Sequence, residues 1–254
     1  MFCAGVLAMS ACLAEAAEMA EPGENLVRNG NFLAWDTYSG KGVTTTSVGV
    51  PPNSLPKDWY GGPGVGATAT YDVVPFSPGQ TDVPGNPERF FRVSWSVSPT
   101  KDWPGEAHHQ PAFRFTFLEY FGMGDVHLLE GKTAICSFYA RTNEGSVDIV
   151  PLLWHSYDAN TPGIAGVKGK GYELFESSGK PGVVTVAQGA PNPEAVCRLT
   201  SRWQRFEKRI ALPGTQNKSV TPGNYTGVGF DLVAREVNTI DLAEIRVVPL
   251  QGQD

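Results

Sequence analysis

The side chains best suited to hold a ligand lie in the segment 150–158, which reads VPLLWHSYD. Successive side chains of a β-strand point to opposite faces, so a strand here would place His155 and Tyr157 on one face and Trp154 on the other. One face must pack in the core, and the sequence leaves open which face that is. Either arrangement brings an aromatic ring to the open face, and the carboxylate of Asp158 follows at the end of the strand.

A second group of candidate residues lies before this strand. Trp103 sits in the polar loop KDWPGE, outside any alternating pattern, and Arg114 lies in the run AFRFTFL. Aromatic rings stack on the C–H faces of sugars, while planar polar side chains bond to the hydroxyl groups. We therefore predict a polysaccharide-binding site in which rings and polar groups act together: Trp103, Trp154 and Tyr157, with His155, Asp158 and Arg114.

The same residue types leave an enzyme as the alternative. A polysaccharide lyase needs a base near neutral pKa and a cation that holds a carboxylate, and His155, Tyr157 and Arg114 supply such types. Glycoside hydrolysis needs two carboxylates in one cleft, for which the chain offers several candidates: Glu119, Asp125, Asp148, Glu173 and Asp231. No diagnostic spacing supports either reaction, so we expect binding and assign no catalytic residue.

The composition is typical of a protein of strands and turns. The chain of 254 residues has 29 Gly and 20 Pro, and only 18% of its residues are charged. Many turn-forming residues with few charges indicate short strands joined by loops. The net charge of −6 and the scattered Lys and Arg residues argue against nucleic acid as a partner, because phosphate contacts need clustered cations.

Runs of alternating residues predict where the strands lie. The two longest stretches without such a run are 36–58 and 158–196, which we expect to be long loops, and Trp59 and Trp203 are expected in the core. Together these features predict an all-β fold, a β-sandwich of jelly-roll type with two antiparallel sheets and long loop insertions. The expected strands cover residues 89–97, 112–118, 133–141, 146–157, 203–212, 226–233 and 239–247.

The first twenty residues differ from the rest of the chain. An apolar run of about a dozen residues is followed by small residues, which predicts a signal peptide over 1–20 and a secreted or cell-surface location. The run is too short for a transmembrane helix, which takes about 20 residues. The sequence MSAC at 9–12 also resembles a bacterial lipoprotein box, in which case Cys12 would carry a lipid anchor.

Two cysteines follow the leader, Cys136 and Cys197. In an oxidising compartment they could form a disulfide that closes a loop of about 60 residues and adds about 4 kcal/mol in the chain-entropy model. The alternative is a pair of buried free thiols, since each cysteine lies in or beside an apolar strand. The sequence leaves this choice open.

Several segments of the chain resemble segments of known protein families and follow one another in the same order. The opening NLVRNGNF at 25–32 and the closing TIDLAEIRVVPL at 239–250 resemble the first residues and the last strand of galactose-binding-like jelly-roll carbohydrate-binding modules. The segments between them are similar to carbohydrate-binding-like segments of phage and prophage tail proteins: FSPGQTDVPGNP at 76–87, FFRV at 90–93, LEGKTAICSFYAR at 129–141, SRWQRFEKRIALP at 201–213 and PGNYTGVGFDL at 222–232.

This resemblance implies a single jelly-roll domain over residues 24–250 that meets a glycan on its concave sheet or loop rim. Many such modules hold a structural calcium ion through a Glu after the opening Asn-Gly-x-Phe and an acidic pair in the last strand. Here Leu33 follows Phe32, and Asp241 and Glu244 are the candidate calcium ligands. No other cofactor is expected. The tail-protein likeness adds a further alternative, a tail or surface assembly protein that binds a protein partner through an apolar patch.

Overall fold

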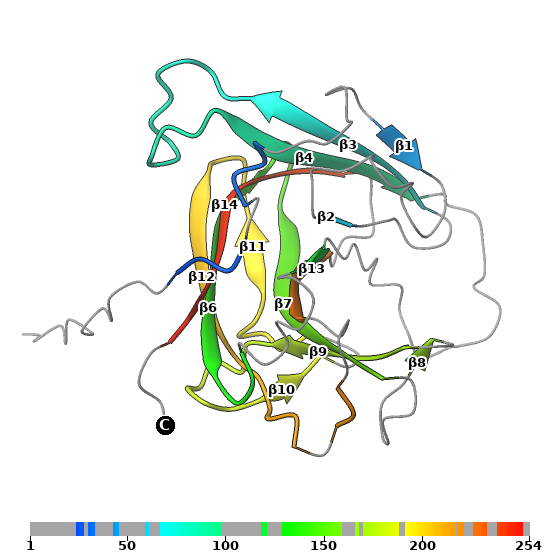
Figure 1. Ribbon diagram of the computed structural model, residues 1–254. Helices are drawn as coiled ribbons and strands as arrows, with labels where there is room; N and C mark the ends of the chain where they lie inside the picture. The colour runs from blue at the N-terminus through cyan, green and yellow to red at the C-terminus, as the bar shows by residue number, and fades with distance from the viewer. Residues whose placement is uncertain are drawn as a thin grey trace, which may run out of the picture.

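The computed structural model describes residues 24–27, 30–33, 43–45, 59–60, 67–97, 118–120, 129–158, 166–167, 170–187, 191–216, 218–220, 226–232 and 238–250. Within these ranges the regular structure consists of strands, and none of the residues is helical (Figure 1). In this part of the chain there is accordingly no helix long and apolar enough to cross a membrane. The predicted leader and the lipid-anchor candidate Cys12 lie outside the described residues.

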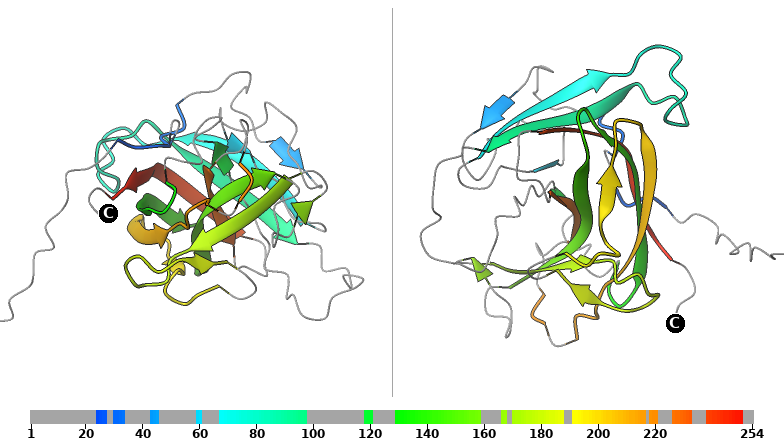
Figure 2. Two further views of the ribbon diagram at one scale, coloured as in Figure 1. Left: turned by 60° about the horizontal axis from the view of Figure 1, so that its bottom comes forward. Right: turned by 180° about the vertical axis from the view of Figure 1, so that it is seen from behind.

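The first sheet, sheet A, contains six antiparallel strands. In Figure 1, β3 and β4 run across the top and β6 and β12 run down one side, so the sheet is strongly twisted. Seen from behind in Figure 2, β6 and β12 again lie side by side. The strand order is β1 (Val43–Thr45), β3 (Ala67–Pro75), β4 (Arg89–Val97), β14 (Asn238–Pro249), β6 (Thr133–Thr142) and β12 (Gln204–Ala211).

The second sheet, sheet B, is also antiparallel and contains eight strands. Its main order is β10 (Thr185–Val186), β9 (Lys170–Glu176), β7 (Val147–Asp158), β13 (Thr226–Leu232), β5 (Leu118–Tyr120) and β2 (Trp59–Tyr60). In addition, β11 (Cys197–Leu199) pairs with β7, and β8 (Gly166–Val167) pairs with β9.

The main hydrophobic core lies between the two sheets. Sheet A contributes Phe91, Phe138 and Leu242, and sheet B contributes Leu153 and Phe230, all of them buried in one cluster. The rings of Phe138 and Phe230 meet edge to face across the core, 4.9 Å apart. Two antiparallel sheets that enclose a shared core form a β-sandwich, so the predicted fold class is confirmed.

The last strand, β14, lies in the middle of sheet A between β4 and β6. Its register with β6 shifts between Ala243 and Arg246, and Glu244 adopts φ 50° at this point. A β-bulge of this kind bends a strand. Figure 1 shows β14 turning from the top of the molecule down along β6, so the bulge lets one strand follow the twist of the whole sheet.

The opening segment of the domain is bound to this bent strand. The amide of Leu26 donates to the carbonyl of Val247 (2.9 Å), and the side chain of Asn25 accepts from the amide of Val247 (2.9 Å). The amide of Ile245 donates to the carbonyl of Gly30 (3.0 Å). A Cβ at Gly30 would lie 2.0 Å from the carbonyl oxygen of Ile245, so only glycine fits there.

Most of the predicted strands are confirmed, namely those that became β4, β6, β7, β12, β13 and β14. The predicted strand 112–118 lies outside the described residues except for Leu118. The expectation of long loops over 36–58 and 158–196 was wrong in part, because the first contains β1 and the second contains β8, β9 and β10. Strand β9 lacks alternation because a second small cluster covers its outer face, so that the neighbours Leu174 and Phe175 are both buried.

The two predictions for core tryptophans came out differently. Trp59 is 3% exposed and packs in the main core, as predicted. Trp203 is only half-buried, and it packs on the opposite side of sheet A against Phe76 and Phe90. The prediction of a core position for Trp203 was therefore wrong in part: Trp203 packs against a hydrophobic cluster, but this cluster is separate from the main core and includes residues of the β3–β4 loop, which the strand pattern alone does not indicate.

The two described cysteines are buried free thiols. Cys136 lies on β6 and Cys197 on β11, and both belong to the main core. Burial raises the pKa of both thiols, that of Cys197 to about 11. Of the two alternatives that the sequence left open, the structure has the free thiols.

Candidate functional site

The outer face of sheet A carries a row of charged residues in direct register across four strands. Asp72 of β3 lies opposite Arg92 of β4, and Arg92 lies opposite Asp241 of β14. Asp241 in turn lies opposite Arg141 of β6. Their strand neighbours, such as Phe91, belong to the main core, so the alternation of side chains places this row on the face that points away from the core.

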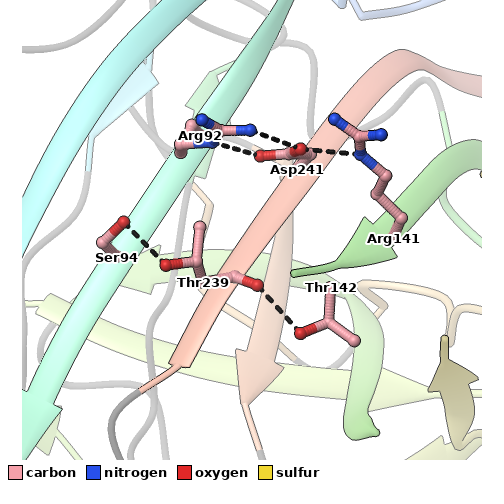
Figure 3. A network of polar contacts seen from close by, with 6 residues as sticks. All are labelled: Arg92, Ser94, Arg141, Thr142, Thr239 and Asp241. Atoms are coloured by element: carbon pink, nitrogen blue, oxygen red, sulfur yellow. Dashed lines mark hydrogen bonds and ion pairs between the residues drawn. The ribbon is translucent and has the colours of Figure 1, made fainter. Parts of the chain in front are cut away.

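Both arginines bind the same carboxylate (Figure 3). Arg92 donates from Nε to Oδ1 (2.7 Å) and from Nη2 to Oδ2 (2.9 Å) of Asp241, and Arg141 donates from Nε to Oδ2 (2.8 Å). The side chain of Asp241 is fully buried, whereas those of Arg92 and Arg141 are 27% and 29% exposed. The hydrogen bond to Asp241 raises the pKa of Arg92. A single carboxylate thus fixes two guanidinium groups in place.

Aromatic rings surround the two guanidinium groups. Arg141 lies over the ring of Trp203, 4.8 Å from its centroid, and over Phe90 at 5.6 Å. Arg92 lies over Phe90 at 5.3 Å. Phe76 from the β3–β4 loop packs against Phe90 and Trp203 at centroid distances of 4.9 and 5.3 Å. These contacts leave the arginines little freedom to change position.

The guanidinium groups keep hydrogen-bond donors that no described residue uses. Arg141 engages only its Nε, so both of its Nη groups are unengaged within the described part of the chain, as is Nη1 of Arg92. Beside them lie the hydroxyl groups of Ser94 and Thr239, 2.9 Å apart, and Thr142 donates to the carbonyl of Thr239 (2.9 Å). We call Arg92, Arg141, Asp241, Trp203 and Phe90 the arginine face.

The arginine face combines fixed N–H donors with partly exposed aromatic surface. Arginine offers five N–H groups in a planar fork, which suits hydroxyl and carboxylate oxygens. Because Asp241 and the rings already hold the guanidinium groups, a ligand would not have to order them on binding. The arrangement is suited to binding an oxygen-rich molecule that lies across β4, β14 and β6.

The predicted site strand β7 has both faces partly or fully buried. His155 and Tyr157 lie on the same face as Leu153, which packs in the main core, and both are fully buried. Trp154 lies on the other face, half-buried against the small cluster of Val150, Leu152, Leu174 and Ala195. Of the two arrangements left open by the sequence, the structure has the one in which Trp154 is on the outer face.

His155 and Tyr157 form part of a small polar cluster on the inner face of sheet B. The hydroxyl of Tyr157 lies 3.3 Å from Nδ1 of His155, and Lys218 Nζ lies 5.3 Å from the centroid of the Tyr157 ring. Lys218 also pairs with Glu173 at 3.2 Å. Burial, followed by the charge of Glu173, raises the pKa of Tyr157. With His155 and Tyr157 fully buried, this cluster does not form an open face for a polymer.

The remaining predicted sugar-binding residues are not brought together by the described part of the structure. Trp103 and Arg114 lie outside the described residues. Asp158 ends β7 opposite Lys170, but its side chain is not among those described. The roles predicted for these residues therefore stay predictions.

The two candidate calcium ligands lie in different surroundings. Both oxygens of Asp241 accept hydrogen bonds from arginines, so a cation would have to displace Arg92 and Arg141. Glu244 lies at the bulge beside a pocket of about 230 Å³ that is also lined by Asn25 and Arg246. Burial raises the pKa of Glu244, against the opposing effect of Arg246. Two carboxylates in such places do not fit a shared calcium ion, and the described residues contain no group of three metal-binding side chains.

Of the residues of the arginine face, only Asp241 was predicted as a site residue, and it was predicted as a calcium ligand. Arg92 and Arg141 each alternate with core residues on their own strands, which indicates an outward position and nothing more. Their meeting depends on the register of β14 with both β4 and β6, and these strands are far apart in the sequence. The charged residue Asp241 lies between the apolar residues Ile240 and Leu242 in β14, and this is the signal that could have indicated a buried partner.

No protein-family model and no curated protein matches the chain. Among solved structures it is similar to the CBM22-1 xylan-binding domain of Paenibacillus barcinonensis Xyn10C, with 9% identity, coverage of 92% of this chain and 99% of that one, and a TM-score of 0.41. It is also similar to a family 11 carbohydrate-binding module of Clostridium thermocellum in complex with a mixed-linked tetrasaccharide. This match has 14% identity, covers 79% of this chain and 94% of that one, and has a TM-score of 0.41. A third similar structure is the enzymatically active domain of tailspike protein 4 from bacteriophage CBA120. This match has 12% identity, covers 89% of this chain and 21% of that one, and has a TM-score of 0.36.

These are the kinds of protein that the sequence resemblance named. At such identities and TM-scores the likeness carries no conclusion about the fold or about a ligand. The two-sheet architecture itself rests on the strand pairing described above.

Proposed function

We propose that this protein binds a polysaccharide on the arginine face of sheet A. The observation that supports this proposal best is the pair of guanidinium groups held by Asp241 beside Trp203, with N–H donors that no described residue engages. Sugars need both components, because their hydroxyl and ring oxygens accept hydrogen bonds while their C–H groups pack on aromatic surface. Binding outside the cell also agrees with the leader predicted over residues 1–20.

The position of these groups on a sheet also favours a long ligand. The arginine face extends over β4, β14, β6 and the start of β12, which hold one another by regular pairing. A site on paired strands keeps its shape better than a site on loops. Several sugar units of a polymer could therefore bind to neighbouring strands at once, and each contact could be weak.

Binding to a panel of soluble and insoluble polysaccharides, measured for the full chain and for Trp203→Ala, tests this proposal. We expect binding to at least one polysaccharide and a loss of roughly tenfold or more in affinity for Trp203→Ala, since removal of an aromatic contact costs on the order of 1–2 kcal/mol. Trp154→Ala is the matched control, because Trp154 is also half-buried on an outer face but belongs to sheet B.

Other outcomes would redirect the proposal. If Trp154→Ala abolishes binding and Trp203→Ala does not, the site lies on sheet B around β7, the strand of the predicted site. If sugars or unsaturated uronates appear in the supernatant, the protein is an enzyme. Thermal unfolding of both variants identifies any loss that is due to unfolding rather than to a missing contact.

A second candidate function is assembly with a protein partner. Val183, Val184 and Val186 are 37–45% exposed and lie next to one another at β10, the end strand of the main order of sheet B. Exposed apolar residues at a sheet edge favour pairing with another chain. Sedimentation at increasing concentration, with and without Val184→Lys, tests it: concentration-dependent association that this variant abolishes would support assembly.

A further inference from the structure

We infer that the ligand of the arginine face is an acidic polysaccharide, whose anionic oxygens bind to Arg141 and Arg92. This inference rests on the proposed function and specifies the chemical class of the glycan. It depends on the balance of charge at the site, on the groups that each arginine leaves unengaged, and on the contrast with other arginines of the protein.

The row contains two carboxylates and two guanidinium groups, but only one of the carboxylates is bound to Arg141. Two guanidinium groups share the one buried carboxylate of Asp241, with which both are in direct contact. Asp72 lies on the far side of Arg92, away from Arg141, and its charge acts on Arg92. Among the described residues, the carboxylate bound to Arg141 is therefore also bound to Arg92, and it neutralises the charge of Arg141 only in part. The protein as a whole carries a net charge of −6.

The open side of Arg141 has the geometry for a carboxylate or sulfate. Its Nε is engaged by Asp241, whereas its two Nη groups, at the end of the fork, have no hydrogen-bond partner among the described residues (Figure 3). A planar pair of N–H donors binds two oxygens of one anion by parallel hydrogen bonds, which are about twice as strong as those between neutral groups. The ring of Trp203 on one side limits the access of water and strengthens such a contact.

Other arginines of sheet A and sheet B do not share this arrangement. Arg198 forms a two-point pair with its own partner Asp148 (2.9 and 3.0 Å), and Arg205 pairs with Glu207 (2.8 Å). Both are more than half exposed and neither shares its carboxylate with a second arginine among the described residues. Their charges are neutralised locally and screened by solvent. An incompletely neutralised, rigid arginine distinguishes the arginine face from these surface pairs.

Matched pairs of polymers that differ only in charge test this inference. Polygalacturonate and its methyl ester share one backbone, and dextran sulfate and dextran share another, so the two pairs separate recognition of carboxylate from recognition of sulfate. We expect the full chain to bind one acidic polymer roughly tenfold or more tightly than its neutral counterpart, because hydrogen bonds to a charged group are stronger than those between neutral groups. This preference should decrease steadily with added NaCl.

Variants then assign the preference to Arg141. Arg141→Gln should remove the preference for the acidic polymer, whereas Arg141→Lys should retain part of it, since lysine keeps the charge without the planar fork. Arg198→Gln removes one positive charge from an exposed pair on sheet B and should leave the preference unchanged. Thermal unfolding shows whether the variants are folded at the temperature of the assay, and the salt dependence of the unmodified protein tests the role of charge without any substitution.

The outcomes separate this inference from the proposed function. Equal binding of acidic and neutral polymers, lost in Trp203→Ala, would leave the proposed function in place and show that the arginines act on hydroxyl groups. A preference for acidic polymers that persists in Arg141→Gln or disappears in Arg198→Gln would overturn the inference as well. Absence of binding to every polymer would refute the proposed function itself.

Discussion

The side chain of Asp241 is fully buried between two arginines, and this position connects the arginine face to the stability of sheet A. In Asp241→Asn the two guanidinium groups would remain close together without a negative charge between them. We expect the free energy of unfolding to fall by about 3 kcal/mol, at the lower end of values for broken buried pairs because both arginines are partly exposed. Urea denaturation of the folded protein measures this change.

Asp148→Asn is the matched control for Asp241→Asn. Asp148 also binds an arginine through both oxygens, but its partner Arg198 is 71% exposed. Surface pairs contribute little because solvent screens them, so the free energy of unfolding of this variant should be close to that of the unmodified protein. Equal effects of the two substitutions would contradict the view that the shared, buried carboxylate stabilises the sheet.

Glu244 should make the stability of the protein depend on pH. Burial raises the pKa of Glu244 above its usual value of 4.5, so the folded state binds a proton more readily than the unfolded state. Stability from this residue is therefore lost as the pH rises from the unfolded pKa through the folded pKa. We expect Glu244→Gln to gain free energy of unfolding over the unmodified protein as the pH is raised from about 4 to about 7.

Chemical denaturation at a series of pH values measures the difference for Glu244→Gln. A difference that is constant with pH would mean that Glu244 ionises as freely in the folded as in the unfolded state. A bound cation at Glu244, as the sequence resemblance implied, would reverse the trend, because the charged form would then be the favoured one. Adding calcium and a chelator at neutral pH distinguishes these cases.

At the scale of elements, the contact between the opening segment and β14 depends on a glycine. A Cβ at position 30 would lie 2.0 Å from the carbonyl oxygen of Ile245 and 3.1 Å from the side chain of Val27. Gly30→Ala should therefore separate the segment from the strand and lower the free energy of unfolding by about 2 kcal/mol or more. Thermal or urea unfolding tests this expectation.

Gly214→Ala provides the control for Gly30→Ala. The nearest atom to a Cβ at position 214 is 3.9 Å away, and no positive φ strains an alanine there. We expect a change within about 0.5 kcal/mol of the unmodified protein, as for an ordinary surface substitution. A large loss of stability in this variant would contradict the view that the effect of Gly30→Ala comes from the close approach of Ile245.

The elements of the fold were largely predictable from the sequence, whereas the way they meet was not. Strand β4 was predicted with its observed bounds because Phe91 and Val93 face the core while Arg92 and Ser94 face outward. Strand β9 was missed because its residues are buried on both faces, which removes the alternation. The arginine face was missed for another reason: it depends on register between strands that no local pattern encodes.

The candidate site was likewise predictable only in part. The sequence indicated correctly that Trp154 and His155 lie on opposite faces of one strand, since alternation follows from strand geometry alone. It could not indicate that the face of His155 and Tyr157 is the buried one, because that depends on which strands of sheet A lie opposite. Nor could it indicate that Trp203 packs under the β3–β4 loop, which supplies Phe76 from a distant part of the chain.

At the scale of the whole molecule, the two core thiols should react only when the protein unfolds. Cys136 and Cys197 are almost fully buried, and burial raises the pKa of both, so few thiolates form in the folded state. In a chain with Cys3→Ser and Cys12→Ser, we expect a thiol reagent to react very slowly in buffer and with two thiols in concentrated urea. Absence of reaction in urea would mean that the cysteines form a disulfide.

The central place of β14 in sheet A has a consequence for the order of folding. Among the described strands, this one comes last along the chain, yet β4 and β6 join the same sheet only through it. Until it arrives, both strands keep open edges, and pairing over such sequence distances makes folding slow. Asp241 lies on the same strand, so a nascent chain would complete its core and fix its two arginines in one event. Folding intermediates without the complete core would therefore also lack the fixed arginines.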